Sequence, residues 1–359
     1  MKILHISRSM GQGGAQKIVY QLCMDNHSCE QVVISAGGYY VQELESIGIK
    51  HYIIPDMDKK NPILIFSTLK KIMTVVKKEK IDVIHTHHRM AAFYARIVSI
   101  MTKTPTVYTS HSIFNDKKLL MKFSLKKSVI VAVGDGVKQN LINEYGIKEN
   151  DIVVIKNTIV VQKSEYIDDY LTKMKSEGKI LIGIIGRLSQ QKAIDIFLHC
   201  IKKCKESHPD IIAVVIGDGE KREELQILVK ELDIVNDVYF MGYQKNVLDI
   251  IERLDFVVST SQREGLPLNP IEVFSQGKTI IASNISGNNE VITDGVNGLL
   301  CEKDNIEEFA EKMHYLISHP DVRDRLEKNA LNTYLKEYDY KLFIDKYMGI
   351  YENLEKGKA

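Results

Sequence analysis

The sequence contains no apolar run long enough to cross a bilayer. Its longest runs of this kind, such as ILIGIIG from Ile180 to Gly186, fall far below the roughly 20 residues of a transmembrane helix. The N-terminal MKILHISRSM reaches polar residues too early to form the hydrophobic core of a secretory signal peptide. We therefore expect a cytoplasmic protein.

Cysteine is scarce, and the five cysteines are scattered through 359 residues. An odd number without regular spacing predicts free thiols rather than a disulfide framework. Cys200 and Cys204 stand one helical turn apart, but no second pair follows at ligand spacing, so a zinc site is not expected.

A nicotinamide-dinucleotide fingerprint is also missing. KILHIS is followed by Gly11, Gly13 and Gly14, but Gln16 stands where the G-x-G-x-x-G pattern needs its last glycine. No acidic residue ends the next apolar segment, QVVISAGG, to hold a ribose. The glycines still indicate a tight turn before a helix that begins near Ala15. Such a turn either serves only the fold or lets backbone N–H groups approach an anion.

Length and charge set the broad organisation. A chain of 359 residues predicts two domains of roughly 150–200 residues each, and 44% hydrophobic with 26% charged residues is ordinary for a globular protein. Residues 1–165 carry 23 Lys and Arg against 14 Asp and Glu, a net charge of +9, whereas residues 166–359 carry −8. The basic half is expected to face a phosphorylated ligand, a nucleic acid or an anionic lipid.

Both halves alternate short apolar, β-rich segments with longer amphipathic ones. Continuously apolar segments are typical of parallel strands buried on both faces, so each half is predicted to form an open α/β sheet. We expect the boundary between residues 157 and 179, and only helices near the C-terminus. The expected strands are KILHIS, QVVISAG, HYIIP, DVIHTH, TVYTSH, VIVAVG and DIVVIKN, then KILIGIIGRL, IIAVVIGDG, DVYFMGY, DFVVST and KTIIAS.

Ligands of open α/β sheets bind beyond the carboxyl ends of the strands, so residues just after strands are the candidates for a site. In the second half, Arg187 and Lys192 follow the first strand, and Gly217 begins a Gly-Asp-Gly turn after the next one. The two cations are either solvated loop charges or ligands for a diphosphate.

Two glutamates, Glu264 and Glu272, flank the turn in SQREGLPLNPIEVFSQG and are separated by seven residues. They are interpreted as an acid/base pair, as ligands for sugar hydroxyls, or as a helix cap beside a surface charge. For the cap, Asn269 is expected at the N-cap and Pro270 at the first helical position, which places Glu272 at the capping-box position.

Histidines cluster after two expected strands of the first half. His85, His87 and His88 lie in HTHHRM, and His111 follows TVYTS. A metal site at His85 and His87 is conceivable, but no carboxylate joins them locally, so we favour one histidine beside a reacting group.

A basic amphipathic segment follows His111. Its lysines alternate with apolar residues, which suits either a solvated helix face or contact with an anionic bilayer. These lysines are Lys117, Lys118, Lys122, Lys126 and Lys127.

Taken in order, GGAQ, GRLSQQK, GDG and the Glu-x7-Glu stretch resemble the motifs of the family 4 glycosyltransferases, which are retaining enzymes of the GT-B fold. The resemblance implies two Rossmann-like doubly wound domains facing across a cleft. Residues 1–165 would bind the acceptor, residues 166–335 the nucleotide-sugar donor, and residues 336–359 would form a helix that packs back on the first domain.

The resemblance also implies roles for single residues. Arg187 and Lys192 would hold the donor diphosphate and neutralise the leaving group in place of a metal ion, with Glu264 beside the donor sugar. Glu272 would bind the ribose, and His111 would lie near the reacting sugar or acceptor. The other donor-binding residues would be Gly13, Gly14, Gly217, Gly242, Tyr243, Gly265, Leu266, Pro267 and Leu268, and the lysines listed above would face the membrane or the acceptor.

Four segments depart from the family pattern. Ala193 replaces the usual glycine after the lysine, KNTIV replaces Asn-Gly-Val-Asp, and GGAQ replaces GGAE. These three concern the acceptor side or the hinge and leave donor binding intact. EGLP replaces EGFG beside the donor sugar and leaves the identity of the sugar open.

We therefore expect a metal-independent retaining glycosyltransferase without a cofactor. It would transfer a hexose or N-acetylhexosamine, most simply from a UDP-sugar, to a polyprenyl-linked or other lipid-linked glycan in capsule or O-antigen biosynthesis, at the inner face of the cell membrane. Few aromatic residues interleave with the cations, so nucleic acid is not expected. The alternatives are a sugar-nucleotide epimerase, a non-catalytic nucleotide-sugar-binding module and a dinucleotide-dependent oxidoreductase. Carboxylate spacing alone does not exclude a glycoside hydrolase; the diphosphate-type cations and the two-domain architecture do.

Overall fold

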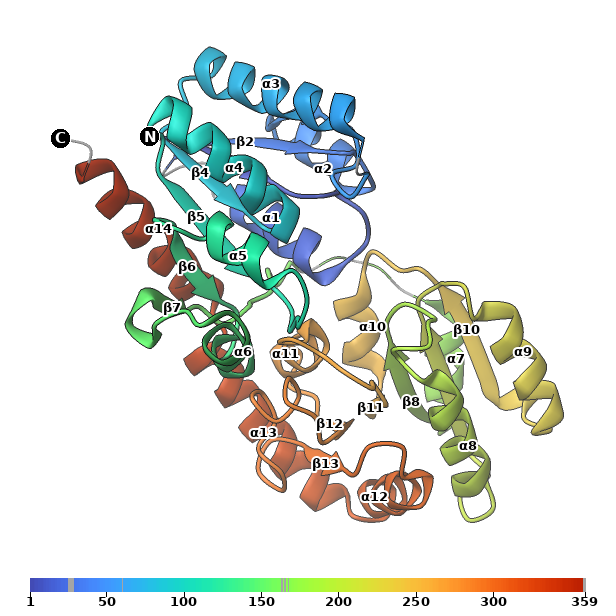
Figure 1. The fold of residues 1–359 in the computed structure, drawn as a ribbon. Helices are drawn as coiled ribbons and strands as arrows, with labels where there is room; N and C mark the ends of the chain where they lie inside the picture. The colour runs from blue at the N-terminus through green and yellow to red at the C-terminus, as the bar shows by residue number, and fades with distance from the viewer. Residues whose placement is uncertain (25–28, 60, 163, 165, 167, 358–359) are drawn as a thin grey trace. The chain divides into compact units, whose positions relative to one another are not determined.

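The computed structural model describes residues 1–24, 29–59, 61–162, 164, 166 and 168–357 (Figure 1). The chain forms two compact units. The N-terminal unit comprises Met1–Ile159 and the segment that begins at Tyr340, and the C-terminal unit comprises Val160–Asp339. The sequence predicted domain boundaries at residues 165 and 335, together with an acceptor-binding role for the first domain and a donor-binding role for the second. This assignment stays a prediction.

The N-terminal unit contains a seven-stranded, all-parallel sheet in the order β3-β2-β1-β4-β5-β6-β7. All seven expected strands are present. They are β1 (Lys2–Ile6), β2 (Glu30–Ser35), β3 (Lys50–Ile53), β4 (Val83–Thr86), β5 (Thr106–Ser110), β6 (Val129–Ala132) and β7 (Ile152–Val154). The helices are α1 (Gly14–Met24), α2 (Tyr40–Ser46), α3 (Pro62–Lys78), α4 (Arg89–Thr102), α5 (Lys118–Ser124), α6 (Asp135–Tyr145) and α14 (Tyr340–Lys356), with a 3-10 turn at Glu149–Asp151.

The C-terminal helix α14 packs on the N-terminal unit, as the family resemblance implied. Its buried face includes Tyr347 and Tyr351. The Tyr351 hydroxyl lies 2.6 Å from Nδ1 of His85 on β4, and the Tyr347 hydroxyl lies 3.1 Å from Oγ1 of Thr109 on β5. Because all of these groups are buried, each hydrogen bond satisfies two polar atoms that would otherwise lose their solvation.

The C-terminal unit contains a six-stranded parallel sheet in the order β10-β9-β8-β11-β12-β13. The five strands expected here are confirmed, and the short sixth strand was not foreseen. The strands are β8 (Ile180–Ile185), β9 (Ile211–Ile216), β10 (Val238–Gly242), β11 (Phe256–Ser259), β12 (Ile280–Ser283) and β13 (Leu299–Cys301). The helices are α7 (Asp169–Ser176), α8 (Ile194–Lys205), α9 (Arg222–Glu231), α10 (Val247–Arg253), α11 (Leu268–Ser275), α12 (Ile306–Ser318) and α13 (Pro320–Glu337), with a 3-10 turn at Val235–Asp237.

The strand order places one switch point in each sheet. Strand order reverses between β1 and β4 in the first sheet and between β8 and β11 in the second. The loops that leave two such neighbouring strands run to opposite sides, which opens a crevice at their carboxyl ends. A site is therefore expected at each of these two positions.

The five cysteines are free, as the sequence predicted, and all five are buried. Among the helices that the structure describes, none is both long enough and apolar enough to span a membrane.

Candidate active site

Glycine turns bring three loops of the C-terminal unit into backbone contact. Gly217, with φ +136°, is packed so tightly that an added Cβ would lie 1.9 Å from the carbonyl oxygen of Gly186. The Gly217 N–H donates to the Gly242 carbonyl over 2.8 Å. A Cβ at Gly219 would lie 2.5 Å from the Leu188 carbonyl oxygen. Only glycine fits at Gly217 and Gly219, because a Cβ there would clash with the main chain of the neighbouring loop.

An ion pair joins the two loops at the switch point of this sheet. Lys192, after β8, lies with its Nζ 2.7 Å from Oε1 of Glu264, after β11. The side chains are only 20% and 12% exposed. The Thr260 hydroxyl donates to the backbone carbonyls of Lys192 and Ala193 over 2.9 and 2.8 Å, which ties the end of β11 to the start of α8. The structure thus brings together two of the residues for which the family resemblance implied roles at the donor diphosphate and the donor sugar.

Arg187 has a different environment from Lys192. Its Nε donates to Oε2 of Glu220 over 3.0 Å, and its side chain is 71% exposed. An exposed ion pair of this kind contributes at most about 1 kcal/mol to stability, so the guanidinium can exchange Glu220 for an anionic ligand at little cost.

The capping-box interpretation of Glu272 is wrong. Helix α11 begins at Leu268, after Pro267 in an extended conformation, and has no side-chain cap. Asn269 is not the N-cap, because it lies inside the first turn, where its Nδ2 donates to the Ile185 carbonyl over 2.5 Å. Glu272 therefore lies in the second turn, 5% exposed, where its carboxylate cannot cap the helix.

The other expected donor residues of this unit lie at the same edge of the sheet. Gly242, with φ +69°, and the half-exposed Tyr243 follow β10. The turn from Gly265 to Leu268 leads into α11, and an added Cβ on Gly287 would lie 2.4 Å from the Gly265 carbonyl oxygen. Gly13 and Gly14 belong to the other unit, where Gly14 starts α1.

The backbone conformation of Ala193 explains why other members of the family usually have glycine at this position. Ala193 lies beside Lys192 in the C-terminal unit, and not on the acceptor side or at the hinge as expected from the sequence. It immediately precedes α8 with φ +46° and ψ +51°, in the left-handed region. That conformation costs a residue with a Cβ about 1–2 kcal/mol, and glycine adopts it freely.

A cavity of about 320 Å³ opens in the N-terminal unit beyond the ends of β1, β4 and β5. Two arginines on its wall are held by carboxylates. Arg8 forms two 3.0 Å hydrogen bonds to Asp56, and Arg89 pairs with Asp116. Gly13 and Gly14 do not line the cavity, although the next two residues do. The lining residues are Ser7, Arg8, Ser9, Ala15, Gln16, Ala36, Asp56, His87, His88, Arg89, Tyr108, His111, Ser112 and Phe114.

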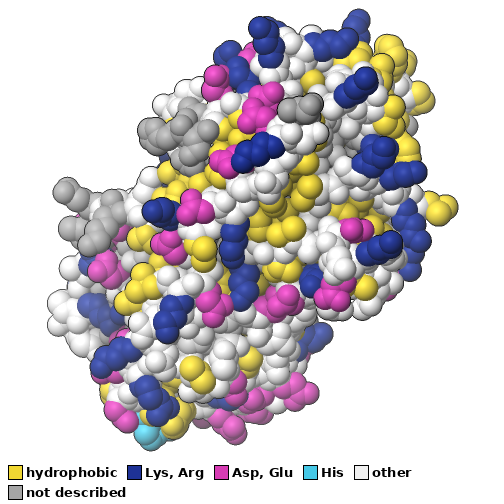
Figure 2. All heavy atoms as spheres, turned by 90° about the vertical axis from the view of Figure 1, so that its left-hand side faces the viewer, with side chains coloured by type: hydrophobic (Ala, Val, Ile, Leu, Met, Phe, Trp, Pro, Cys, Tyr) yellow, Lys and Arg dark blue, Asp and Glu magenta, His cyan; other side chains and the backbone are white. Residues whose placement is uncertain are grey.

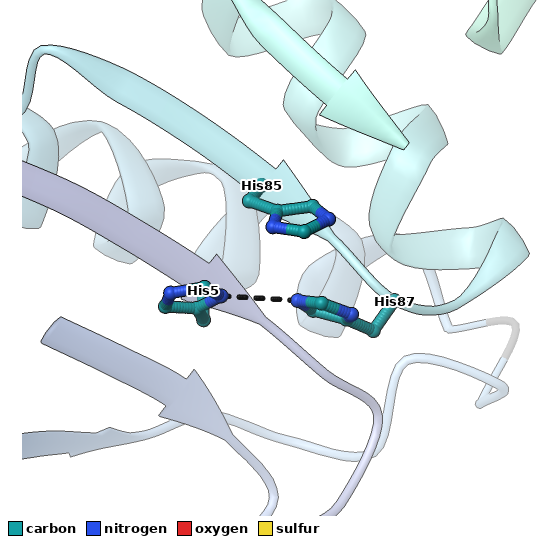
Figure 3. Close-up of side chains that lie close together, drawn as sticks. All are labelled: His5, His85 and His87. Carbon is teal, nitrogen blue, oxygen red and sulfur yellow. Dashed lines mark hydrogen bonds between the residues drawn. The ribbon is translucent and has the colours of Figure 1, made fainter. Parts of the chain in front are cut away.

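A buried histidine cluster lies next to this cavity, and one of its members was missed by the sequence analysis. His5 on β1 pairs in register with His85 on β4, and its Nδ1 lies 3.0 Å from Nε2 of His87 (Figure 3). Nδ1 of His87 lies 3.2 Å from Nε2 of His111. Burial lowers the pKa of His5 and of His111 to about 4 and that of His85 and His87 well below the usual value, so all four are neutral at pH 7. His5 is the single histidine of its strand, and nothing in the neighbouring sequence indicated that it would contact His85 and His87.

The cluster has the spacing of a metal site but not the free lone pairs. One nitrogen each of His5, His85 and His87 lies within 4.8 Å of the others. His85 is bonded to Tyr351 and Thr109 through its two nitrogens, and both nitrogens of His5 and of His87 are hydrogen-bonded as well. A metal ion would have to break several of these bonds, so we do not assign one. His88 lies apart, where its Nδ1 accepts from the Met90 N–H at the start of α4.

Models of two known protein families match this sequence. The sequence matches the model of Glycosyltransferase Family 4 over residues 12–163 and that of Glycosyl transferases group 1 over residues 170–333. An uncharacterized glycosyltransferase of Methanocaldococcus jannaschii is 29% identical over 68% of this chain and 63% of that protein. A UDP-Gal:alpha-D-GlcNAc-diphosphoundecaprenol alpha-1,3-galactosyltransferase of Escherichia coli is 24% identical over 98% of this chain and 96% of that one.

The fold is equally informative. The crystal structure of Anabaena Alr3699/HepE in complex with UDP-glucose matches with a TM-score of 0.84 at 20% identity, over 98% of this chain and 100% of that one. The two parallel α/β sheets and the returning C-terminal helix are those of a GT-B glycosyltransferase. The chain belongs to the family 4, or group 1, glycosyltransferases, which use a nucleotide sugar. The family resemblance and the fold class expected from the sequence are confirmed, whereas the roles of single residues stay predictions.

Proposed function

We propose that this protein is a retaining, metal-independent glycosyltransferase that moves a hexose or N-acetylhexosamine from a UDP-sugar to a lipid-linked glycan. The observation that carries the donor half of the proposal is the Lys192–Glu264 pair at the β8/β11 switch point. The tightly packed glycine turns after β8 and β9 lie at the same end of the sheet, and their backbone N–H groups are proposed to contact the diphosphate. The UDP-glucose named for the Anabaena protein favours UDP.

In this proposal, charge neutralisation drives departure of the nucleoside diphosphate. The Lys192 ammonium and the Arg187 guanidinium stabilise the negative charge that develops on the leaving phosphate oxygen. Glu264 accepts hydrogen bonds from donor-sugar hydroxyls, and Glu272 from ribose hydroxyls. The N–H groups at the start of α11 add a positive helix end for the sugar and phosphate oxygens. Gly242 and Tyr243 lie beside the base.

The cavity of the N-terminal unit is proposed to bind the acceptor. Arg8 and Arg89 offer cations to an acceptor diphosphate, and Phe114, with the Arg89 guanidinium 3.8 Å above its ring, offers an apolar wall. The Escherichia coli relative is named for a diphosphoundecaprenol acceptor. His111 lines the same cavity, so we place it beside the reacting hydroxyl. A lipid-linked acceptor suits a role in capsule or O-antigen synthesis.

A thermal-shift panel in EDTA with UDP, GDP, ADP, CMP and NAD tests the donor site. A ligand that binds only the native state at a hundred times its Kd adds about 2.7 kcal/mol of stability, or roughly 5–10 °C for a unit of this size. We expect UDP alone to raise the melting temperature, and the Lys192→Ala variant to lose most of the shift. A shift with NAD alone, or none until a divalent metal is added, would contradict the proposal. Incubation with the UDP-sugar and no acceptor then separates a transferase from an epimerase, which would convert the sugar.

The basic segment after His111 is proposed to contact an anionic membrane surface on the cytoplasmic side. Met121 and Leu125 are buried in their own unit, whereas Leu119 is 86% and Phe123 42% exposed. The exposed side therefore combines apolar side chains with the lysines at 117, 118, 122, 126 and 127, all of which are exposed. Figure 2 shows one face of the molecule, where cations and hydrophobic atoms are exposed alongside acidic groups.

We expect replacement of these five lysines by serine to weaken binding to anionic vesicles, because each lysine near such a surface contributes about 1 kcal/mol. Cosedimentation with vesicles of stated anionic lipid content, at low and at physiological salt, measures the effect. A control with five exposed lysines of the C-terminal unit changed to serine keeps the net charge equal. Equal binding by both variants would leave the segment an ordinary solvated surface. The control lysines are Lys173, Lys230, Lys303, Lys328 and Lys336.

A further inference from the structure

A series of hydrogen bonds runs from the interior of the first sheet to the wall of the acceptor cavity. Oε1 of Gln31 lies 2.8 Å from Nε2 of His5, and Nδ1 of His5 lies 3.0 Å from Nε2 of His87 (Figure 3). Nδ1 of His87 lies 3.2 Å from Nε2 of His111. The last atom of the series, Nδ1 of His111, is buried and has no hydrogen-bond partner among the described residues.

The direction of hydrogen-bond donation along the series is set at its Gln31 end, by the contacts of Cys29. The Cys29 thiol donates to the Met348 thioether over 3.7 Å, and a thioether sulfur has no proton to give. The Cys29 sulfur therefore accepts from the Gln31 amide nitrogen, 2.9 Å away. The Gln31 carbonyl oxygen then faces His5 and requires a proton on Nε2 of that ring.

Because each of the three imidazoles is neutral, the direction of hydrogen-bond donation is the same at every ring of the series. A neutral imidazole carries one N–H and one lone pair, and burial keeps the pKa of each of these histidines below its usual value. With its proton on Nε2, His5 accepts at Nδ1 from the Nε2–H of His87. His87 in turn accepts at Nδ1 from the Nε2–H of His111, which leaves the lone pair of His111 on Nδ1.

We infer that His5 and His87 are positioning residues that hold His111 in the Nε2–H tautomer, so that its bare Nδ1 accepts a hydrogen bond from a substrate hydroxyl. His111 lines the cavity, and its unpartnered acceptor is satisfied when a hydroxyl occupies the site. The inference rests on the proposed function only for the hydroxyl being that of a sugar. His85 belongs to a separate set of bonds, through Tyr351 and Thr109, and takes no part in the series.

The matched variants His5→Asn and His5→Leu test the series at a residue that does not line the cavity. The Asn oxygen Oδ1 takes the place of the imidazole Nδ1 and keeps an acceptor for His87, whereas Leu removes it. Both variants leave Gln31 without its histidine partner, so the comparison isolates the acceptor. In His5→Leu, His87 is free to carry its proton on Nδ1 and donate to Nε2 of His111, which shifts the His111 proton to Nδ1.

Nitrogen-15 NMR of imidazole-labelled protein reads the tautomer directly, with the His111 signals assigned by their loss in His111→Gln. We expect an unprotonated Nδ1 and a protonated Nε2 for His111 in the wild type and in His5→Asn, and a mixture in His5→Leu. Transfer assays should give kcat/KM about tenfold lower for His5→Leu and within about threefold of the wild type for His5→Asn.

Different results would contradict the inference about the His111 tautomer and the proposed glycosyltransferase function. A wild-type His111 protonated on Nδ1 would overturn the inference whatever the activity, and this measurement does not depend on either His5 variant folding. Equal kcat/KM for folded His5→Leu and His5→Asn would overturn it as well. An inactive wild-type enzyme with the expected tautomer would contradict the proposed function and leave the series intact.

Discussion

Replacing Lys192 by alanine should lower kcat of sugar transfer by about 10²–10³-fold, the usual cost of one preorganised charge-stabilising group. The ammonium is held 2.7 Å from Glu264 in a partly buried position, where its charge is poorly screened by water. A steady-state transfer assay with a saturating UDP-sugar measures the effect, and circular dichroism checks that the fold is kept.

Lys205 offers a matched control for that experiment. It forms a similarly buried pair with Asp237, 2.6 Å long, on the helix that follows Lys192. Lys205→Ala removes a comparable ion pair without touching the proposed diphosphate site, so its rate should stay near that of the wild type. If both variants lose activity equally, loss of an ion pair and not of a catalytic cation is responsible. If Lys192→Ala transfers sugar at the wild-type rate, the residue has no role in catalysis.

Replacing Gly217 by alanine should destabilise the C-terminal unit by about 3–5 kcal/mol. The new Cβ would lie 1.9 Å from the Gly186 carbonyl oxygen, and φ +136° is unfavourable for any residue with a Cβ. Overpacking and backbone strain each cost about 1–3 kcal/mol, and here they add because backbone meets backbone and neither loop can yield. Thermal or urea unfolding measures the loss, and UDP binding should weaken with it because the same turn borders the proposed donor site.

The Gly295→Ala variant distinguishes the cost of backbone strain from the cost of a steric clash. It also has a positive φ, +71°, but nothing lies within 4 Å of an added Cβ. Gly295→Ala should therefore cost only the strain of the left-handed conformation, about 1–2 kcal/mol. Equal destabilisation in the two variants would mean that the contact between the Gly186 and Gly217 loops is looser than the structure shows.

Much of the architecture was accessible from the sequence because buried parallel strands are continuously apolar. Twelve strands were expected, and each is present. The thirteenth, β13, has only three residues, too few for such a pattern to stand out. The family motifs also placed Lys192, Gly217 and Glu264 after strands, where the structure has them.

Local rules failed where a side chain had a distant partner. Asn269 had the composition of a helix cap, but its amide binds the end of β8, 84 residues away in sequence, and the helix begins before it. Arg187 and Lys192 looked equivalent in the sequence, yet one is exposed beside Glu220 and the other is enclosed beside Glu264.

The sequence by itself determined the fold class, because buried parallel strands leave a local hydrophobic pattern, and it indicated the family through short motifs. It also predicted at which end of each sheet a site is expected, because turn residues follow the strands there. Only the tertiary structure decided which side chains meet. Lys192 and Glu264 are 72 residues apart, and His5 and His87 are 82 apart. Strand order and register bring these pairs together, and burial then lowers the pKa of His5 and His87 so that both are neutral at pH 7. Neither effect can be predicted from a pattern that spans only a few neighbouring residues.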